Sequence, residues 1–149
     1  MNLDLLREML KRHEGLRLKP YPCSADVLTI GYGWNLSNIL PEDIASYLRV
    51  TGEITRTMAE RLLNISIETA TRQCWSIFPR FGGFTEKRQM ALIDFVFNVG
   101  AGGTLKFKKA LAAIETGDWE KAADEFQDSK WFKQVGDRGP EIVNMIREG

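Results

Sequence analysis

The sequence predicts an α+β fold in a single folding unit, with a small β-hairpin lobe, a connecting helix and a larger helical lobe. Two short runs of alternating residues, 16–21 and 27–32, are separated by a Pro-Cys-Ser-Ala-Asp segment, a composition typical of a hairpin turn. Most of the remaining chain has apolar residues at helical spacing between start and stop signals. We expect a cleft between the two lobes.

Helices are expected on both sides of the hairpin. Apolar residues recur at helical spacing in segment 1–15, and a second short helix over 41–50 ends at Gly52. A long helix then runs from its N-cap Thr55 to the residue before Pro79. Its apolar residues are spread widely around the helix, which suits a helix shared between two lobes: Met58, Leu62, Ile65, Ala70 and Trp75.

The C-terminal half is predicted to be entirely helical. Thr85 can cap a helix that ends near Gly100, and the next helix carries Leu105, Leu111 and Ile114 at core spacing. Further helices are expected over 105–115, 119–127 and 137–147. Within one domain of 1–149, we assign about 14–50 to the β-containing lobe, about 55–79 to the connecting helix, and about 80–149 with the N-terminal helix to the helical lobe.

Composition excludes several classes of function. The chain has 20 Lys and Arg residues against 20 Asp and Glu residues, which removes the electrostatic argument for nucleic-acid binding. No apolar stretch reaches membrane-spanning length or forms the core of a signal peptide, so we expect synthesis in the cytoplasm and no membrane insertion. Cys23, Cys74 and the single His13 are too few and too scattered for a zinc site. We expect no metal, no cofactor and two free thiols.

Polar chemistry and tight turns are concentrated in residues 13–34, which we interpret as an active site. Glu14 lies where the first helix ends in Gly15. Gly31 and Gly33 bracket Tyr32, so the second run of the hairpin ends where the backbone can bend sharply or let another group approach closely.

The spacing of three polar residues in this segment resembles that of the phage-type lysozymes, family 24 of the glycoside hydrolases. Eight residues separate Glu14 from Cys23, five more precede Thr29, and Ile-Gly-x-Gly follows. The family has Glu, Asp and Thr at these positions, so Cys23 departs from its pattern. The resemblance covers nearly the whole chain and includes Glu14-Gly15-Leu16-Arg17-Leu18-Lys19, Val96-Phe97-Asn98-Val99-Gly100, Trp119 followed by Ala122-Ala123, and Trp131 with Arg138.

The resemblance implies a role for each of these residues. Glu14 is the expected acid that protonates the leaving oxygen, and the hydroxyl of Thr29 is expected to face it across the cleft. Arg138 either holds Glu14 through a charged hydrogen bond or is a solvated surface residue. Phe97 and Asn98 match family residues that bind sugar. Trp34, where the family usually has His, either stacks on sugar or fills the small lobe.

Cys23 leaves several interpretations open. A thiol is a poor general base at neutral pH, because only a small fraction is ionised. It can instead orient a water molecule together with Thr29, act as a soft nucleophile in a covalent route, or be a turn residue without a catalytic role. Asp26 is the nearest replacement carboxylate, but it is displaced toward the tip of the hairpin and is expected to point to solvent.

The resemblance therefore implies a muramidase that cleaves the β-1,4 bond between N-acetylmuramic acid and N-acetylglucosamine in peptidoglycan, with inversion as the family precedent. The expected partner is the glycan strand alone, and we expect a monomer that acts on the cell wall after release. Two alternatives stay open. One is a weakly active or inactive lysozyme-like module that binds peptidoglycan, and the other is chitin or transglycosylase chemistry on the same fold.

Overall fold

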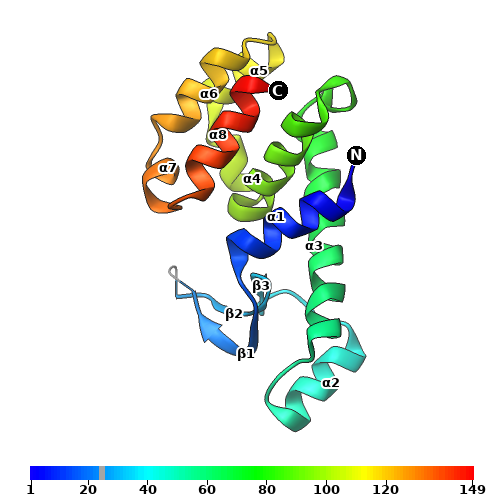
Figure 1. Cartoon of the computed structure of the whole chain (residues 1–149). Helices are drawn as coiled ribbons and strands as arrows, with labels where there is room; N and C mark the ends of the chain where they lie inside the picture. Colours follow the sequence, from blue (N-terminus) through cyan, green and yellow to red (C-terminus); the bar gives the residue numbers. More distant parts are fainter. Residues whose placement is uncertain (24–25) are drawn as a thin grey trace. The chain divides into compact units, whose positions relative to one another are not determined.

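The computed structural model describes residues 1–23 and 26–149 (Figure 1). Its elements are α1 (Leu3–Glu14), β1 (Arg17–Pro22), β2 (Leu28–Gly31), β3 (Trp34–Asn35), α2 (Glu42–Thr51), α3 (Arg56–Ile77), the 3-10 turn η1 (Phe81–Gly83), α4 (Glu86–Leu105), α5 (Lys108–Glu115), α6 (Trp119–Gln127), α7 (Lys130–Gln134) and α8 (Arg138–Glu148). The predicted α+β class is confirmed. Positions 24 and 25 of the predicted hairpin turn lie outside the described residues.

The chain divides into two compact units, and the division falls within α3. One unit, the sheet unit, comprises Leu3–Ser66; the other, the helical unit, comprises Met1–Asn2 and Ile67–Gly149. The first helix therefore groups with the sheet, whereas the sequence analysis assigned it to the helical lobe. The cleft expected between the lobes stays a prediction.

The sheet unit is built on the amphipathic helix α1. Leu6, Met9 and Leu10 are buried on one face, which explains the helical spacing of its apolar residues. Gly15 adopts the left-handed conformation (φ 71°), so the helix ends immediately after Glu14. On the polar side, Lys11 Nζ lies 2.6 Å from Glu60 Oε1, an ion pair that joins α1 to α3.

Three antiparallel strands follow in the order β1-β2-β3. The sequence predicted the first two strands but not β3, because two residues are too short to show an alternating pattern. The turn between β2 and β3 uses positive φ angles at Gly31 (66°) and Gly33 (75°), as the two glycines around Tyr32 indicated. Ile30 pairs with Trp34, and both side chains are buried.

The connecting helix, α3, has nearly the bounds that the sequence predicted. The Thr55 side chain accepts a hydrogen bond from the N–H of Met58, which is the expected N-cap arrangement. Among the apolar residues that were spread around this helix, Ile65 and Trp75 are exposed, while Leu62 and Ala70 are buried. Among the described residues no single helix is long and apolar enough to cross a membrane; α4 and α5 pass that test only as a pair bent by 103°.

In the helical unit, α4 is kinked where the sequence predicted its end. Gly100 has φ 77° and ψ 167°, and the Thr104 hydroxyl donates to the Gly100 carbonyl at 2.7 Å. The chain then makes one more helical turn, which belongs to α4 and not to the next helix. The prediction that Leu105 faces the core is therefore wrong: Leu105 ends α4 and is 54% exposed.

An aromatic cluster forms the core of the helical unit. The ring of Phe95 on α4 meets the rings of Phe107, Phe126 and Trp131 edge to face, with centroids 4.9, 4.8 and 5.0 Å away. Trp131 lies on α7, a helix of five residues that the sequence analysis missed because so short a segment shows no periodicity. Ser129 caps this helix by accepting from the N–H of Phe132.

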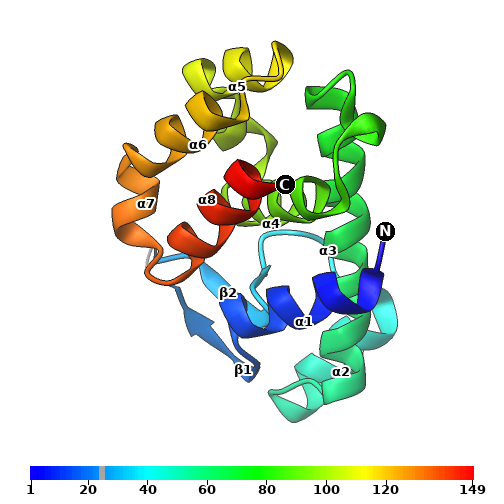
Figure 2. The same ribbon diagram turned by 45° about the horizontal axis from the view of Figure 1, so that its top comes forward.

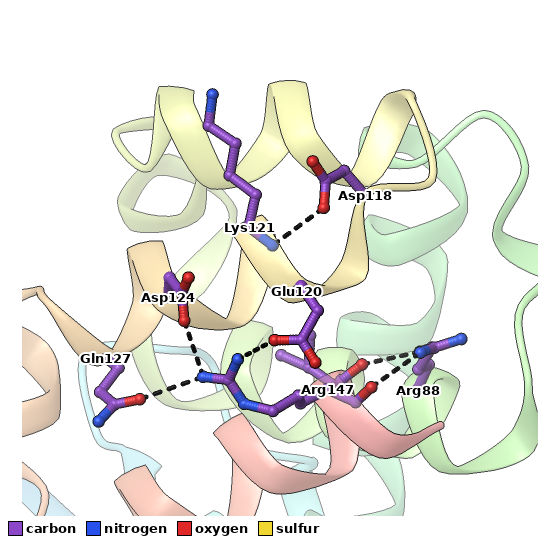
Figure 3. Close-up of polar contacts among 8 residues, drawn as sticks. Arg88, Asp118, Glu120, Lys121, Asp124, Gln127 and Arg147 are labelled. Carbon is purple, nitrogen blue, oxygen red and sulfur yellow. Dashed lines mark hydrogen bonds and ion pairs between the residues drawn. The ribbon is translucent and has the colours of Figure 1, made fainter.

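Two arginines hold the end of the last helix in place (Figure 3). Arg88 donates to the carbonyls of Ile146 and Arg147, at 2.8 and 3.1 Å, and its guanidinium carbon lies 4.4 Å from the centre of the Trp119 ring. Arg147 reaches the α6 side chains Glu120, Asp124 and Gln127. These contacts keep α8 beside α6, as Figures 1 and 2 show, and α8 begins with the functional candidate Arg138.

Candidate active site

Glu14 occupies a position that a glycine makes possible. Glu14 is the last residue of α1 and is half-buried. A Cβ atom on Gly33 would lie 2.4 Å from Oε1 of Glu14 and 2.9 Å from its Cδ. The carboxyl group therefore lies directly against the backbone of the β2–β3 turn, where a Cβ atom at position 33 would displace it. The two features that the sequence singled out separately, the helix-terminal Glu and the glycine pair, form one local structure.

The register of the sheet places several polar residues on one face. Tyr21 of β1 lies opposite Thr29 of β2, and Thr29 lies opposite Asn35 of β3. The N–H of Cys23 donates to the carbonyl of Val27 at 3.0 Å, so the antiparallel pairing continues to Cys23. Because side chains alternate along a strand and opposite residues share a face, the residues on this face are Cys23, Tyr21, Thr29 and Asn35.

The other face of the sheet belongs to the core of the sheet unit. Ile30 and its partner Trp34 are directed to that side, and Trp34 is 7% exposed. Of the two roles left open for Trp34, filling the small lobe agrees with this burial, whereas stacking on a sugar does not.

Thr29 is buried, with 5% of its surface exposed, and its hydroxyl has a defined orientation. Oγ1 donates to the carbonyl of Val27 at 2.8 Å. Because the hydroxyl proton is used in this bond, the lone pairs of the oxygen are left to accept a hydrogen bond from another group. The expectation that Thr29 faces Glu14 across a cleft stays a prediction.

Cys23 is half-buried and Cys74 is fully buried, and the structure contains no disulfide between them. The carbonyl of Cys23 accepts from the N–H of Asp26 at 2.9 Å. Asp26 is exposed and has a positive φ of 59°, in agreement with the expected position near the tip. It does not replace a carboxylate at position 23 on the polar face.

Tyr21 is a further candidate residue, which the sequence motif did not include. It is half-buried, and the guanidinium carbon of Arg17 lies 4.6 Å from the centre of its ring. Burial raises the pKa of the Tyr21 hydroxyl, the negative charge of Glu14 raises it further, and the positive charge of Arg17 partly opposes them; Cys23 adds a smaller increase at high pH, where its thiol is ionised. Strand alternation in the sequence would have found this residue, since Tyr21 precedes Cys23 by two positions.

Arg138, in the helical unit, is only 7% exposed, so it is not the solvated surface residue that the sequence left as one alternative. Its Nε donates to Oδ1 of Asp94 at 2.7 Å, and Asp94 is fully buried on α4. The sequence carried a signal for this pair, because Asp94 is the one charged residue within the apolar segment 90–97. The alternative in which Arg138 also holds Glu14 stays a prediction.

The two predicted sugar-binding residues lie at the end of the first part of α4. Phe97 is half-buried and Asn98 is exposed. The indole nitrogen of Trp131 donates to Oδ1 of Asn98 at 2.8 Å. Since an indole nitrogen can only donate, this bond fixes which end of the amide faces Trp131 and directs the donor nitrogen of Asn98 elsewhere.

Among the described residues, no group of three or more His, Cys, Asp or Glu side chains could hold a metal ion.

Comparison with known proteins identifies the family. The family model of the phage lysozymes matches residues 11–147. The chain is 33% identical to the pre-baseplate central spike protein Gp5 of Enterobacteria phage T4, over 97% of the chain and 28% of that protein. It is 28% identical to probable T4-type lysozyme 1 of Dictyostelium discoideum, over 97% of the chain and 94% of that protein. It is 31% identical to an endolysin of Acyrthosiphon pisum secondary endosymbiont phage 1, over 93% of the chain and 86% of that protein.

The names of these relatives indicate a glycoside hydrolase of the lysozyme class. The chain belongs to the phage lysozyme family, which supports a peptidoglycan-lytic enzyme in general terms. It spans nearly the full length of the lysozyme-named relatives but only 28% of the spike protein, in which the similar segment is part of a larger chain.

Proposed function

We propose that this protein is a muramidase that hydrolyses the β-1,4 bond between N-acetylmuramic acid and N-acetylglucosamine in bacterial peptidoglycan. The observation that supports it best is the placement of the Glu14 carboxyl against Gly33, beside a hairpin whose polar face carries Thr29 and Cys23. A chain of the phage lysozyme family with this arrangement has an acid and a water-orienting group within one small unit. In our proposal the enzyme acts as a monomer on glycan strands of the cell wall after release.

The proposed reaction needs no activated nucleophile on the protein. Glu14 donates its proton to the glycosidic oxygen, the bond between that oxygen and the anomeric carbon breaks, and a water molecule adds its oxygen to the anomeric carbon from the opposite face. The added water then releases one proton to solvent, and Glu14 regains a proton from solvent. Because the transition state resembles an oxocarbenium ion, orienting the water contributes more than deprotonating it early.

In this scheme Thr29 and Cys23 orient the attacking water. Thr29 suits the task because its proton is already donated to Val27, which leaves its oxygen as an acceptor. A neutral thiol at Cys23 is a weak hydrogen-bonding group and a poor base, so it contributes to positioning only. Attack from the face opposite the leaving group gives a product with inverted anomeric configuration.

Three residues of the helical unit have roles proposed from the family resemblance: Arg138, Phe97 and Asn98. The buried pair with Asp94 holds Arg138 in a single orientation, and the bond from Trp131 does the same for Asn98. We propose that Arg138 supports Glu14 and that Phe97 and Asn98 bind the saccharide.

The variant Glu14→Gln tests the assignment. The amide keeps the shape of the side chain but cannot donate a proton in the same way, so turnover of purified cell wall, followed as loss of turbidity, should fall by about a thousandfold. Glu8→Gln is the matched control, since Glu8 is an exposed residue of the same helix. Clearance by the Glu14→Gln variant at close to the parent rate would show that the catalytic acid lies elsewhere.

Cys23 favours a second candidate, a lysozyme-like module that binds peptidoglycan with little or no turnover. Replacement of Cys23 by Asp separates the two functions. If the parent is an enzyme in which Cys23 orients water, Asp should retain or raise the rate, Ser should keep part of it, and Ala should lose more. A parent that binds cell wall without releasing saccharide, while the Cys23→Asp variant hydrolyses it, identifies the binding module.

Analysis of the products tests the reaction type. Hydrolysis gives a reducing end, whereas transglycosylation gives a 1,6-anhydro sugar. Rapid NMR of fresh product should show the inverted anomer; the retained anomer, together with a saccharide trapped on Cys23, would instead establish a covalent route through the thiol.

A further inference from the structure

Tyr21 lies beside the proposed catalytic groups but has no role in the reaction described so far. It is directly opposite Thr29 in the antiparallel pair, and Cys23 follows it by two residues on the same face of the sheet. Side chains of directly opposite residues approach to about 5 Å between their Cβ atoms. The Cβ atom of Tyr21, from which the ring extends, therefore lies close to Thr29 and Cys23, the two residues that orient water in the proposed reaction.

The local structure of β1 fixes how this side chain is presented. The pairing of β1 with β2 shifts register between Arg17 and Tyr21, an irregularity of the kind that redirects side chains near active sites. Arg17 then packs its guanidinium group over the Tyr21 ring at 4.6 Å. A ring that is half-buried and covered on one face has few alternative orientations, so its hydroxyl is held in a limited region.

The charge around Tyr21 decides what its hydroxyl can do. Burial raises its pKa above the ordinary value near 10.0, and the negative charge of Glu14 acts in the same direction against a smaller opposing effect of Arg17. Tyr21 is therefore a neutral phenol at neutral pH. A neutral phenol has one proton to donate and an oxygen that accepts.

We propose, on the basis of the muramidase function above, that Tyr21 is a further catalytic residue whose oxygen accepts one hydrogen of the attacking water while Thr29 accepts the other. With both hydrogens held by these two oxygens, the neutral Cys23 thiol can act on the water only through its weak S–H donor, and a lone pair of the water is directed at the anomeric carbon. A thiol is a weaker acceptor than a carboxylate, and Tyr21 supplies the oxygen that Cys23 lacks. The bonds formed and broken are those of the hydrolysis described above.

The test is a comparison of Tyr21→Phe with the parent on a soluble peptidoglycan fragment. Phenylalanine keeps the ring that packs against Arg17 and removes only the hydroxyl. We expect kcat to fall by about ten- to a hundredfold with KM changed less than about twofold, because the hydroxyl contacts the water and not the sugar. Tyr47→Phe, an exposed tyrosine on α2, should match the parent in both constants.

Making the same substitution in the Cys23→Asp variant distinguishes a catalytic role of Tyr21 from a structural one. In the Cys23→Asp protein the carboxylate restores a strong acceptor, so Tyr21→Phe should lower kcat by less than about threefold. An equal loss of kcat in both backgrounds would overturn the proposal, as would a Tyr21→Phe variant that is as fast as Tyr47→Phe. If Glu14→Gln abolishes turnover while Tyr21→Phe keeps the kcat of Tyr47→Phe, the muramidase assignment stands and the role of Tyr21 fails. A parent no faster than its Glu14→Gln variant overturns both.

Discussion

Gly33→Ala tests whether the Glu14 carboxyl works in the position that the structure shows. The added Cβ would lie 2.4 Å from Oε1 of Glu14, whereas ordinary van der Waals contact begins at 3.4 Å. The carboxyl must therefore move outward by about 1 Å, which the flexible end of the Glu14 side chain can do without disrupting the fold. A misplacement of about 1 Å in a catalytic group costs roughly a hundredfold in rate.

The same substitution also strains the backbone, and this effect can be separated from the first. Gly33 has a φ of 75°, a conformation that costs a residue with a Cβ atom about 1–2 kcal/mol. For a chain of this length, that penalty lowers the Tm by roughly 2–8 °C. Gly52→Ala is the matched control, because Gly52 has a φ of 79° in the same unit and nothing within 4 Å of its added Cβ.

We therefore expect the two alanine variants to lose similar stability but different amounts of activity. Stability is measured by thermal unfolding followed by circular dichroism. Activity is measured as loss of turbidity of purified cell wall, at a temperature well below the lower of the two Tm values. Gly33→Ala should be about a hundredfold slower than Gly52→Ala. Equal rates for the two variants would contradict the steric argument, since backbone strain alone would then explain both.

Two further predictions concern buried polar groups. Arg138→Ala removes the ion-pair partner of the fully buried Asp94, so it should lower the free energy of unfolding by about 3–5 kcal/mol in a urea titration. The control Arg49→Ala breaks an exposed ion pair and should leave the free energy of unfolding nearly unchanged. Burial raises the pKa of Cys74 to about 12, so only Cys23 should react with a thiol reagent in the native protein, and both thiols should react in urea. Because an unfolded thiol ionises near ~8.5, the stability that comes from burying the neutral Cys74 should be present below that pH and should be lost as the pH rises toward about 12. A native protein with two reactive thiols would contradict the burial of Cys74.

Local signals in the sequence were sufficient to predict the ends of several helices and the two strands of the hairpin. The Thr55 and Thr85 side chains cap the helices that they were expected to start, and Gly100 breaks α4 where a stop was predicted. The hairpin and its glycine pair were also predicted correctly. These features rest on backbone conformation and on bonds within a few residues, so neighbouring sequence is enough to specify them.

Features that depend on distant partners became visible only in the folded chain. The contact of Glu14 with Gly33, the position of Tyr21 opposite Thr29, and the burial of Arg138 against a residue 44 positions away are of this kind. Strand register decides which side chains share a face, and it is set by pairing that no single strand encodes. The prediction for Leu105 failed because this residue ends α4 and does not belong to the helix of Leu111 and Ile114, and its side chain is exposed. A local pattern specifies which residues form an element, whereas burial and the partners of each side chain depend on packing between elements.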